Sequence, residues 1–225
     1  MADRSRNDSE KRVAELAGEF AKALLSGDEL GADVAIRGAI EAELSQTEIY
    51  EELIAPALWL IGDLWQRGEI TVADEHLATE ITQRVLALEQ EARRVRDQRK
   101  GYRVLLATPS GEHHVVALRM VANLLRDAGY RVVMLGGDVP PHALAASATQ
   151  HEPDVICLSA TMPGGDDQVL IAISAVQAQL PGARYVIGGR GLTSRIRQQP
   201  GIGVCERVSD VVGAVDALVK RADLN

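Results

Sequence analysis

The chain has 225 residues, which is enough for one large domain or for two small ones that each bury a core. Its formal net charge of −8 disfavours binding to nucleic acid phosphates and to anionic lipid, so we expect neither nucleic acid nor a membrane among its direct partners. The sequence shows no secretory leader and no apolar stretch of the roughly 20 residues that span a bilayer, which predicts a cytoplasmic protein.

The first half of the chain carries a helical pattern. Residues 1–8 are polar and are expected to form a disordered tail, and a helical domain is expected over residues 9–99. The predicted helices cover about residues 9–25, 30–44, 47–65 and 71–95. Pro56 should kink the third helix or mark its real start, and Thr71 with Asp74 predicts a capping box at the start of the fourth. These elements predict a four-helix bundle.

The periodicity changes after Gly101. Short β-type runs alternate with apolar helices, which predicts a parallel, Rossmann-like (flavodoxin-like) domain over residues 101–225. The predicted strands are 102–108, 131–135, 155–159, 185–187 and 203–205, and the predicted helices are 115–125, 142–149, 168–180 and 211–220. The boundary between the two domains is expected near residues 99–101. In such a sheet, ligand chemistry is found at the carboxyl ends of the strands.

Three short motifs follow predicted strands at that edge. Glu112, His113 and His114 come after the first strand, Ser159-Ala160-Thr161 closes the third, and Gly188-Gly189 closes the fourth. A neutral imidazole is a good ligand for a transition metal, and an acidic neighbour that accepts its other N–H fixes the tautomer. Each piece alone is also typical of a surface histidine loop with small residues at strand ends, so the order and spacing of all three pieces carry the interpretation.

The set resembles the fingerprint of the cobalamin-binding domain family, which is an acid, one residue, His, two residues and Gly, then Ser-x-Leu, then Gly-Gly. The matching positions in this chain are Glu112, His114, Ala117, Ser159, Thr161, Gly188 and Gly189. The 41 residues of 118–158 and the 26 residues of 162–187 separate the three pieces as they do in the family. The resemblance covers the chain from Gly101 to about Ala222.

The resemblance implies a role for each matching residue. His114 would bind cobalt in place of the cofactor's own dimethylbenzimidazole, and Glu112 would orient its ring; His113 is the alternative ligand. Ser159 would bond the displaced base, and Gly188 and Gly189 would let the nucleotide tail pass close to the backbone. In the family the tail lies in a tunnel beside the sheet, and Ala117 in place of Gly would narrow the entrance to this tunnel. Thr161 stands in place of Leu.

The segment Gly136–Pro140 after the second predicted strand has the composition of a turn. In the family this loop borders the corrin, so Asp138 and Val139 are expected either to form the turn alone or also to touch the corrin amides.

The helical half carries a second motif, in which nine residues separate Trp65 from Glu75-His76. It resembles the signature of the CarH/LitR branch of cobalamin photoreceptors, in which the Trp packs on the adenosyl group and the Glu binds its ribose or adenine. Known members carry a His directly after the Trp, whereas this chain has Gln66, which puts a second histidine ligand after illumination in doubt.

The resemblance implies a light sensor that binds adenosylcobalamin and is not an enzyme. Photolysis would change the arrangement of the helical domain or the oligomeric state, as a dimer or a tetramer, and so signal to an unknown protein partner. We expect no MerR-type DNA-binding domain, because the bundle begins at once. Stand-alone photocobilins also hold a bilin, so noncovalent biliverdin is an open alternative. The competing functions are a corrinoid carrier of a methyltransferase system and a cobalamin-dependent antirepressor.

Overall fold

The computed structural model describes residues 2–92, 100–199 and 201–222. The chain divides into two compact units, Met1–Ala92 and Arg93–Asn225. The predicted domain boundary at residue 99 and the predicted end of the fourth helix near residue 95 lie outside the described residues.

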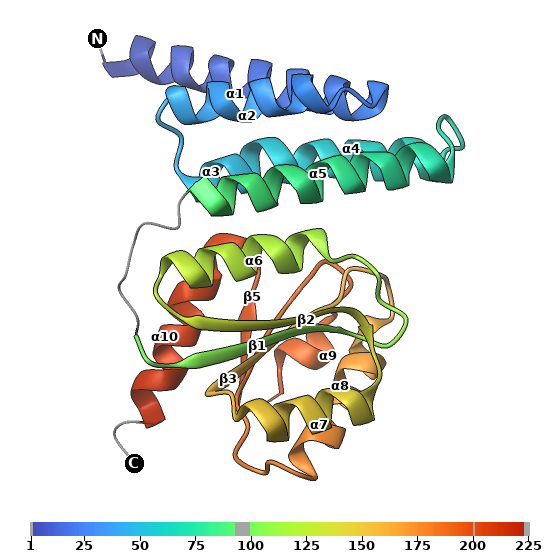
Figure 1. Ribbon diagram of the computed structural model, residues 1–225, viewed down its shortest axis with the longest axis vertical. Helices are drawn as coiled ribbons and strands as arrows, with labels where there is room; N and C mark the ends of the chain where they lie inside the picture. The colour runs from blue at the N-terminus through green and yellow to red at the C-terminus, as the bar shows by residue number, and fades with distance from the viewer. Residues whose placement is uncertain (1, 93–99, 200, 223–225) are drawn as a thin grey trace. The chain divides into compact units, whose positions relative to one another are not determined.

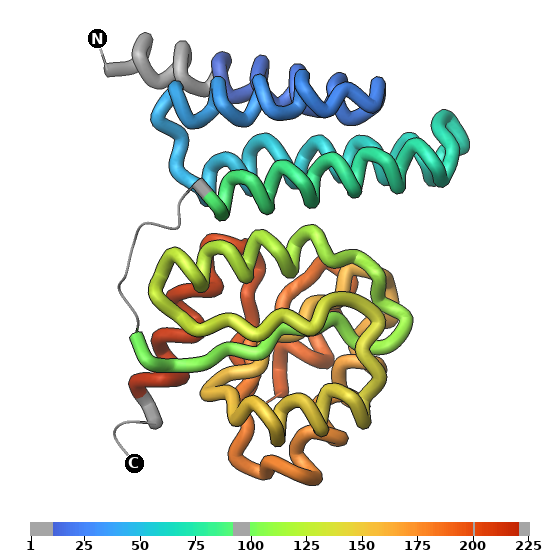
Figure 2. Tube along the Cα trace, viewed as in Figure 1, coloured from blue at the N-terminus to red at the C-terminus, as the bar shows by residue number. Residues whose placement is uncertain are grey.

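The first unit is helical (Figures 1 and 2). Its elements are α1 (Ala2–Ser26), α2 (Glu29–Glu41), α3 (Gln46–Glu48), the π-helix η1 (Ile49–Ile54), α4 (Ala55–Gln66) and α5 (Val72–Ala92). Because α3, η1 and α4 follow one another without a break, these elements form the four helical stretches of a bundle. The expected disordered tail at 1–8 differs from the structure, in which α1 begins at Ala2. Those residues contain neither Gly nor Pro, so nothing in the sequence stops the helix from extending.

Pro56 lies in the first turn of α4, directly after the π-helical segment. Proline has no N–H, and its ring clashes with the carbonyl of the fourth preceding residue in a regular α-helix. The wider π-helical turns, whose hydrogen bonds span five residues, come just before the proline and relieve this conflict. The third helical stretch begins at Gln46, so Pro56 does not mark its real start but lies within it, where the π-helical segment changes to α-helix.

The predicted capping box at the start of α5 is confirmed. The Thr71 backbone N–H donates to Asp74 Oδ2 at 2.8 Å, and the Asp74 N–H donates to Thr71 Oγ1 at 3.3 Å. These hydrogen bonds satisfy two N–H groups at the helix start. The box fixes the first turn of α5, which contains Glu75 and is directly followed by His76.

The second unit is a five-stranded parallel sheet with the order β2-β1-β3-β4-β5. Its strands are β1 (Arg103–Pro109), β2 (Arg131–Val139), β3 (Val155–Ser159), β4 (Tyr185–Gly188) and β5 (Ile202–Cys205). Its helices are α6 (Val116–Asp127), α7 (Pro141–His151), α8 (Gly165–Gln177), α9 (Ser194–Arg197), the 3-10 helix η2 (Val208–Asp210) and α10 (Val211–Ala222). Helices α6 and α10 cover one face, and α7 and α8 cover the other (Figure 1). The predicted Rossmann-like sheet with the flavodoxin-like order is confirmed.

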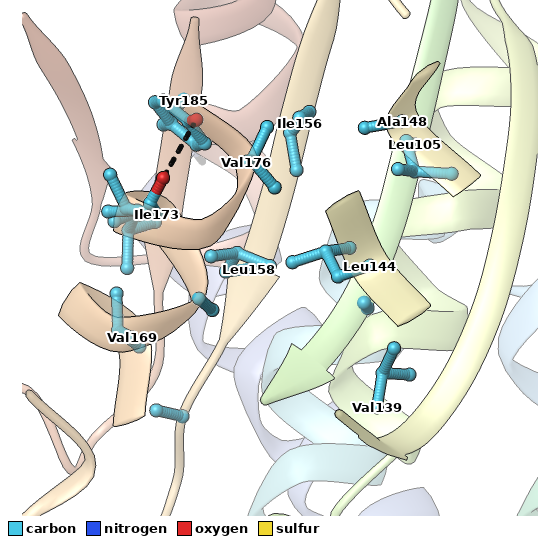
Figure 3. Packing of buried hydrophobic residues seen from close by; sticks show 14 of the residues in the cluster. Leu105, Val139, Leu144, Ala148, Ile156, Leu158, Val169, Ile173, Val176 and Tyr185 are labelled. Atoms are coloured by element: carbon cyan, nitrogen blue, oxygen red, sulfur yellow. Dashed lines mark hydrogen bonds between the residues drawn. The ribbon is translucent and has the colours of Figure 1, made fainter. Parts of the chain in front are cut away.

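Aliphatic side chains fill the space between the sheet and the helices α7 and α8 (Figure 3). The central strands β1 and β3 are buried along almost their whole length, which is why their sequences are continuously apolar rather than alternating. Tyr185 on β4 is buried in this core, and its hydroxyl donates to the carbonyl of Ile173 on α8 at 3.5 Å.

The segment Gly136–Pro140 is not a simple turn. Strand β2 continues to Val139, with irregular pairing in which Ala107 opposes Gly136 and Pro109 opposes Val139. Asp138 has a positive φ of 52° at this irregularity. The extra residues of β2 are accommodated as β-bulges against β1, so tertiary pairing overrides the local turn composition.

Candidate functional site

The three motifs of the second unit lie at one edge of the sheet. Ser159 is the last residue of β3 and pairs in register with Gly188, the last residue of β4. Glu112 and His114 follow β1, the neighbour of β3 on the other side. The strand order reverses between β1 and β3, so the site is at the topological switch point of the sheet.

Glu112 holds the imidazole of His114. Its Oε1 lies 2.5 Å from His114 Nδ1 and also accepts the His114 backbone N–H at 3.0 Å. The carboxylate is buried, whereas the imidazole side chain is half exposed. Since Nδ1 is engaged by the acid, Nε2 on the other side of the ring is the atom suited to bind a metal.

The second oxygen of Glu112 reaches the loop after β3. Its Oε2 accepts the backbone N–H groups of Thr161 at 2.6 Å and of Met162 at 2.9 Å. Burial alone would raise the pKa of Glu112, but the hydrogen bonds from His114, Met162 and Thr161 lower it to about 2. The acid is therefore a carboxylate at neutral pH, which stabilises the tautomer with the proton on Nδ1 and leaves the Nε2 lone pair as ligand.

Asp138 supports this arrangement from β2. Its Oδ1 accepts the Gly111 N–H at 2.7 Å, and its own N–H donates to the carbonyl of Glu112 at 2.9 Å. Thr108 Oγ1 also donates to that carbonyl. Val139 lies in the buried core, where Figure 3 shows it below Leu144, so its side chain has a packing role.

Two glycines permit close contact between loops. A Cβ atom on Gly189, which has a φ of 119°, would overlap the backbone of Ala160, and one on Gly191 would overlap the carbonyl of Met162. Gly188 has more room, because its Cβ would lie 3.4 Å from the nearest atom, the carbonyl oxygen of Cys205. The need for glycine at 189 is thus explained within the protein by the approach of two backbones.

The residues present fit a cobalt corrinoid. Ala117 on α6 is small and half-buried, Ser159 is buried at the strand end, and Thr161 presents its backbone N–H to Glu112. One imidazole, held by a carboxylate, supplies a single protein ligand, which suits a metal whose equatorial positions are filled by a macrocycle. Two residues that hold these loops were not identified from the sequence: Gly191, whose N–H donates to Ala160, and Asp166, which accepts from Thr193. Gly191 could have been found from its place two residues after the Gly-Gly pair.

The first unit presents the second motif at the hairpin between α4 and α5. Trp65, at the end of α4, is 44% exposed and is therefore not a core residue. Glu75 accepts from the Thr79 hydroxyl at 3.0 Å, and its other oxygen lies 2.6 Å from Nδ1 of the exposed His76. An exposed indole and a prepositioned carboxylate are suited to bind a purine nucleoside.

The fold and the site together define a Rossmann-like domain that offers one carboxylate-bound imidazole to a cofactor. Residues 102–215 match the B12 binding domain family, and residues 16–89 match a second family that is also described as a B12 binding domain. The chain belongs to the B12-binding family.

Relatives fall into two groups. The HTH-type transcriptional repressor CarH of Myxococcus xanthus is 30% identical over 168 residues, which are 75% of this chain and 54% of CarH, so the chain spans about half the length of that relative. Trimethylamine corrinoid protein 2 of Methanosarcina acetivorans is 27% identical over 199 residues, which are 86% of this chain and 91% of that protein. The monomethylamine corrinoid protein structure of Methanosarcina barkeri matches with a TM-score of 0.72 at 15% identity, covering 92% of this chain and 98% of its own, which shows the shared fold.

Across the described residues, no helix combines the length and the apolar character that crossing a membrane requires.

Proposed function

We propose that this protein is a light sensor that binds adenosylcobalamin, with His114 as the lower cobalt ligand and Trp65 and Glu75 at the adenosyl group. The observation that carries the proposal is the exposed indole of Trp65, followed by the Glu75-His76 pair at a helix start fixed by a capping box. A carrier that passes a methyl group needs no indole or carboxylate to bind a nucleoside. The similarity to CarH supports the proposal.

The residues of the second unit hold the lower side of the cofactor. Glu112 keeps the His114 ring oriented with Nε2 as ligand, and the Thr161 and Met162 amides keep Glu112 ionised. Ser159 would form a hydrogen bond with the displaced nucleotide base. The small residues Ala117 and Gly188 would leave room for the nucleotide tail of the cofactor. Bound adenosylcobalamin supplies a weak cobalt–carbon bond that visible light breaks.

The residues of the first unit would respond to the presence of the adenosyl group. Trp65 would pack its indole on the purine, and Glu75 would accept from the ribose hydroxyls. When the group is lost, the indole loses its contact and the carboxylate loses its donors, which favours a different arrangement of the helices. Position 66 holds Gln, which is a poor metal ligand, so we do not propose that this residue binds cobalt after illumination.

The test is an absorption spectrum before and after green light. The protein reconstituted with adenosylcobalamin in the dark should show a stable light product, and Trp65→Ala should bind the cofactor through His114 but lose its preference for the adenosyl over the methyl form. Equal affinity of wild type for both forms would contradict the proposal. Addition of biliverdin, followed by absorption in the red, tests the open prediction of a bound bilin.

The second candidate is a corrinoid carrier of a methyltransferase system. It is favoured by the trimethylamine corrinoid protein, which this chain matches over 91% of that protein's length. Protein purified in the dark with its native cofactor separates the two functions, because an adenosyl upper group supports the sensor and a methyl group supports the carrier.

A further inference from the structure

Asp166 is a buried carboxylate outside the cobalamin fingerprint. It lies in the first turn of α8 and is 5% exposed. Its Oδ1 accepts the Thr193 backbone N–H at 3.0 Å, and its Oδ2 accepts the Thr193 hydroxyl. The side chain therefore ties the start of α8 to the segment between β4 and α9.

That segment is seated on the loop after β3. The Gly191 N–H donates to the Ala160 carbonyl at 3.1 Å, and there is no space for a Cβ between Gly191 and the Met162 carbonyl. The Gly165 N–H, next to Asp166, donates to the same Met162 carbonyl at 3.2 Å. The position of the loop after β3 thus depends on both of the elements that Asp166 joins.

The loop after β3 in turn provides the two amides that bind Glu112. Thr161 and Met162 donate to one carboxylate oxygen, and the other oxygen holds the His114 ring. Two buried carboxylates, Glu112 and Asp166, therefore connect the loops that follow the neighbouring strands β1, β3 and β4 at the carboxyl edge of the sheet.

We infer that Asp166 is a positioning residue for metal binding at His114, acting through the Thr161 and Met162 amides and Glu112. The inference rests on the proposed ligation of cobalt by His114, but not on the response to light. Groups that orient a metal ligand typically change metal affinity by about 10- to 100-fold, and the more remote Asp166 should fall at the lower end of that range.

The neighbouring Asp167 provides a matched control. It also joins α8 to the region of α9, through a 2.5 Å ion pair with Arg195, but both of these side chains are exposed. Asp166→Ala and Asp167→Ala each remove one carboxylate between α8 and α9. Exposed ion pairs contribute little, so only the first change should reach the site.

The experiment compares the full-length wild type with both variants in two measurements. Amide hydrogen exchange without cofactor should be about tenfold faster at Thr161 and Met162 in Asp166→Ala, and unchanged within about twofold in Asp167→Ala. After loading with hydroxocobalamin and reduction to Co(II), the electron paramagnetic resonance spectrum should show splitting by the His114 nitrogen, and cobalamin should dissociate about tenfold faster from Asp166→Ala.

Equal exchange and equal dissociation in the two variants would overturn the inference. If Asp166→Ala does not fold, Thr193→Val, which removes only the hydroxyl donor, must show the same changes at smaller size. Absence of nitrogen splitting in the wild type would instead overturn ligation by His114, and the exchange measurement without cofactor would still decide whether Asp166 holds the Glu112 amides.

Discussion

At the scale of single residues, the two adjacent histidines have different environments. Both are exposed in the same loop, but His114 is held by Glu112 through its Nδ1. We expect His114→Ala to lower cobalamin affinity by at least about tenfold, because it removes the proposed protein ligand. Absorption spectroscopy should show loss of histidine ligation, and added imidazole should partly restore it.

His113→Ala is the control and should leave the spectrum unchanged. Loss of ligation in that variant, with retention in His114→Ala, would assign the cobalt to the other histidine.

A second residue-scale prediction concerns Asp216 on α10. Its partners precede β1 and β2, at the opposite edge of the sheet from the candidate site. It accepts from Lys100 at 2.7 Å and from the Tyr130 hydroxyl. Burial would raise its pKa, but the bonds from Lys100 and Tyr130 lower it. A lowered pKa stabilises the folded state above the ordinary value of about 3.9, and this contribution is lost as the pH falls through the folded-state pKa.

Asp216→Asn should therefore destabilise the second unit by roughly 1 kcal/mol at pH 7, since the group is about a third exposed. Urea unfolding at several pH values should show the difference from wild type shrinking below about pH 4. A difference that stays constant down to pH 2 would rule out the charge as its cause.

At the scale of elements, the capping box of α5 should contribute to both stability and function. Thr71→Ala removes the hydroxyl that caps the helix, and loss of such a cap typically costs about 1 kcal/mol. Circular dichroism during urea unfolding should register the loss in the helical unit, and Thr71→Ser should restore it. Identical curves for Thr71→Ala and wild type would show that the cap does not stabilise α5.

The elements also show how far the sequence predicts the fold. The strands β1 and β3 were predicted almost to the residue because burial on both faces makes their sequences continuously apolar. The end of β2 was missed because Gly136 and Asp138 have turn composition and positive φ angles, and only irregular pairing with β1 keeps this segment in the sheet. The short helix α9 and the 3-10 helix η2 carry too few residues for a periodic signal.

In the candidate site, the contact between the side chains of Glu112 and His114 was expected from the sequence, whereas the backbone contacts were not. The amides of Thr161 and Met162 could not be identified in this way, because every residue except proline has an N–H and only the fold selects which ones meet the carboxylate. Asp166 was missed because its partner lies 27 positions away.

At the scale of the whole molecule, the proposed response to light begins in the first unit, which contains Trp65 and Glu75, whereas the proposed cobalt ligand His114 belongs to the second unit. Loss of the adenosyl group would remove the contacts that are proposed for the first unit. We expect size-exclusion and small-angle scattering profiles to differ between dark and illuminated adenosylcobalamin samples. The difference should be smaller with methylcobalamin, and Trp65→Ala should reduce it.

Coincident dark and illuminated profiles of the wild type would contradict the sensor and make the corrinoid carrier the better assignment.

The placement of the aromatic side chains has a practical consequence. The only two tryptophans of the chain, Trp59 and Trp65, both lie on α4, so all indole fluorescence originates in the helical unit. A corrin bound at His114 belongs to the other unit and absorbs where indole emits, so it would act as an energy acceptor. In a Trp59→Phe variant the remaining indole emission comes from Trp65 alone, so its lifetime during illumination would report whether the surroundings of that side chain change.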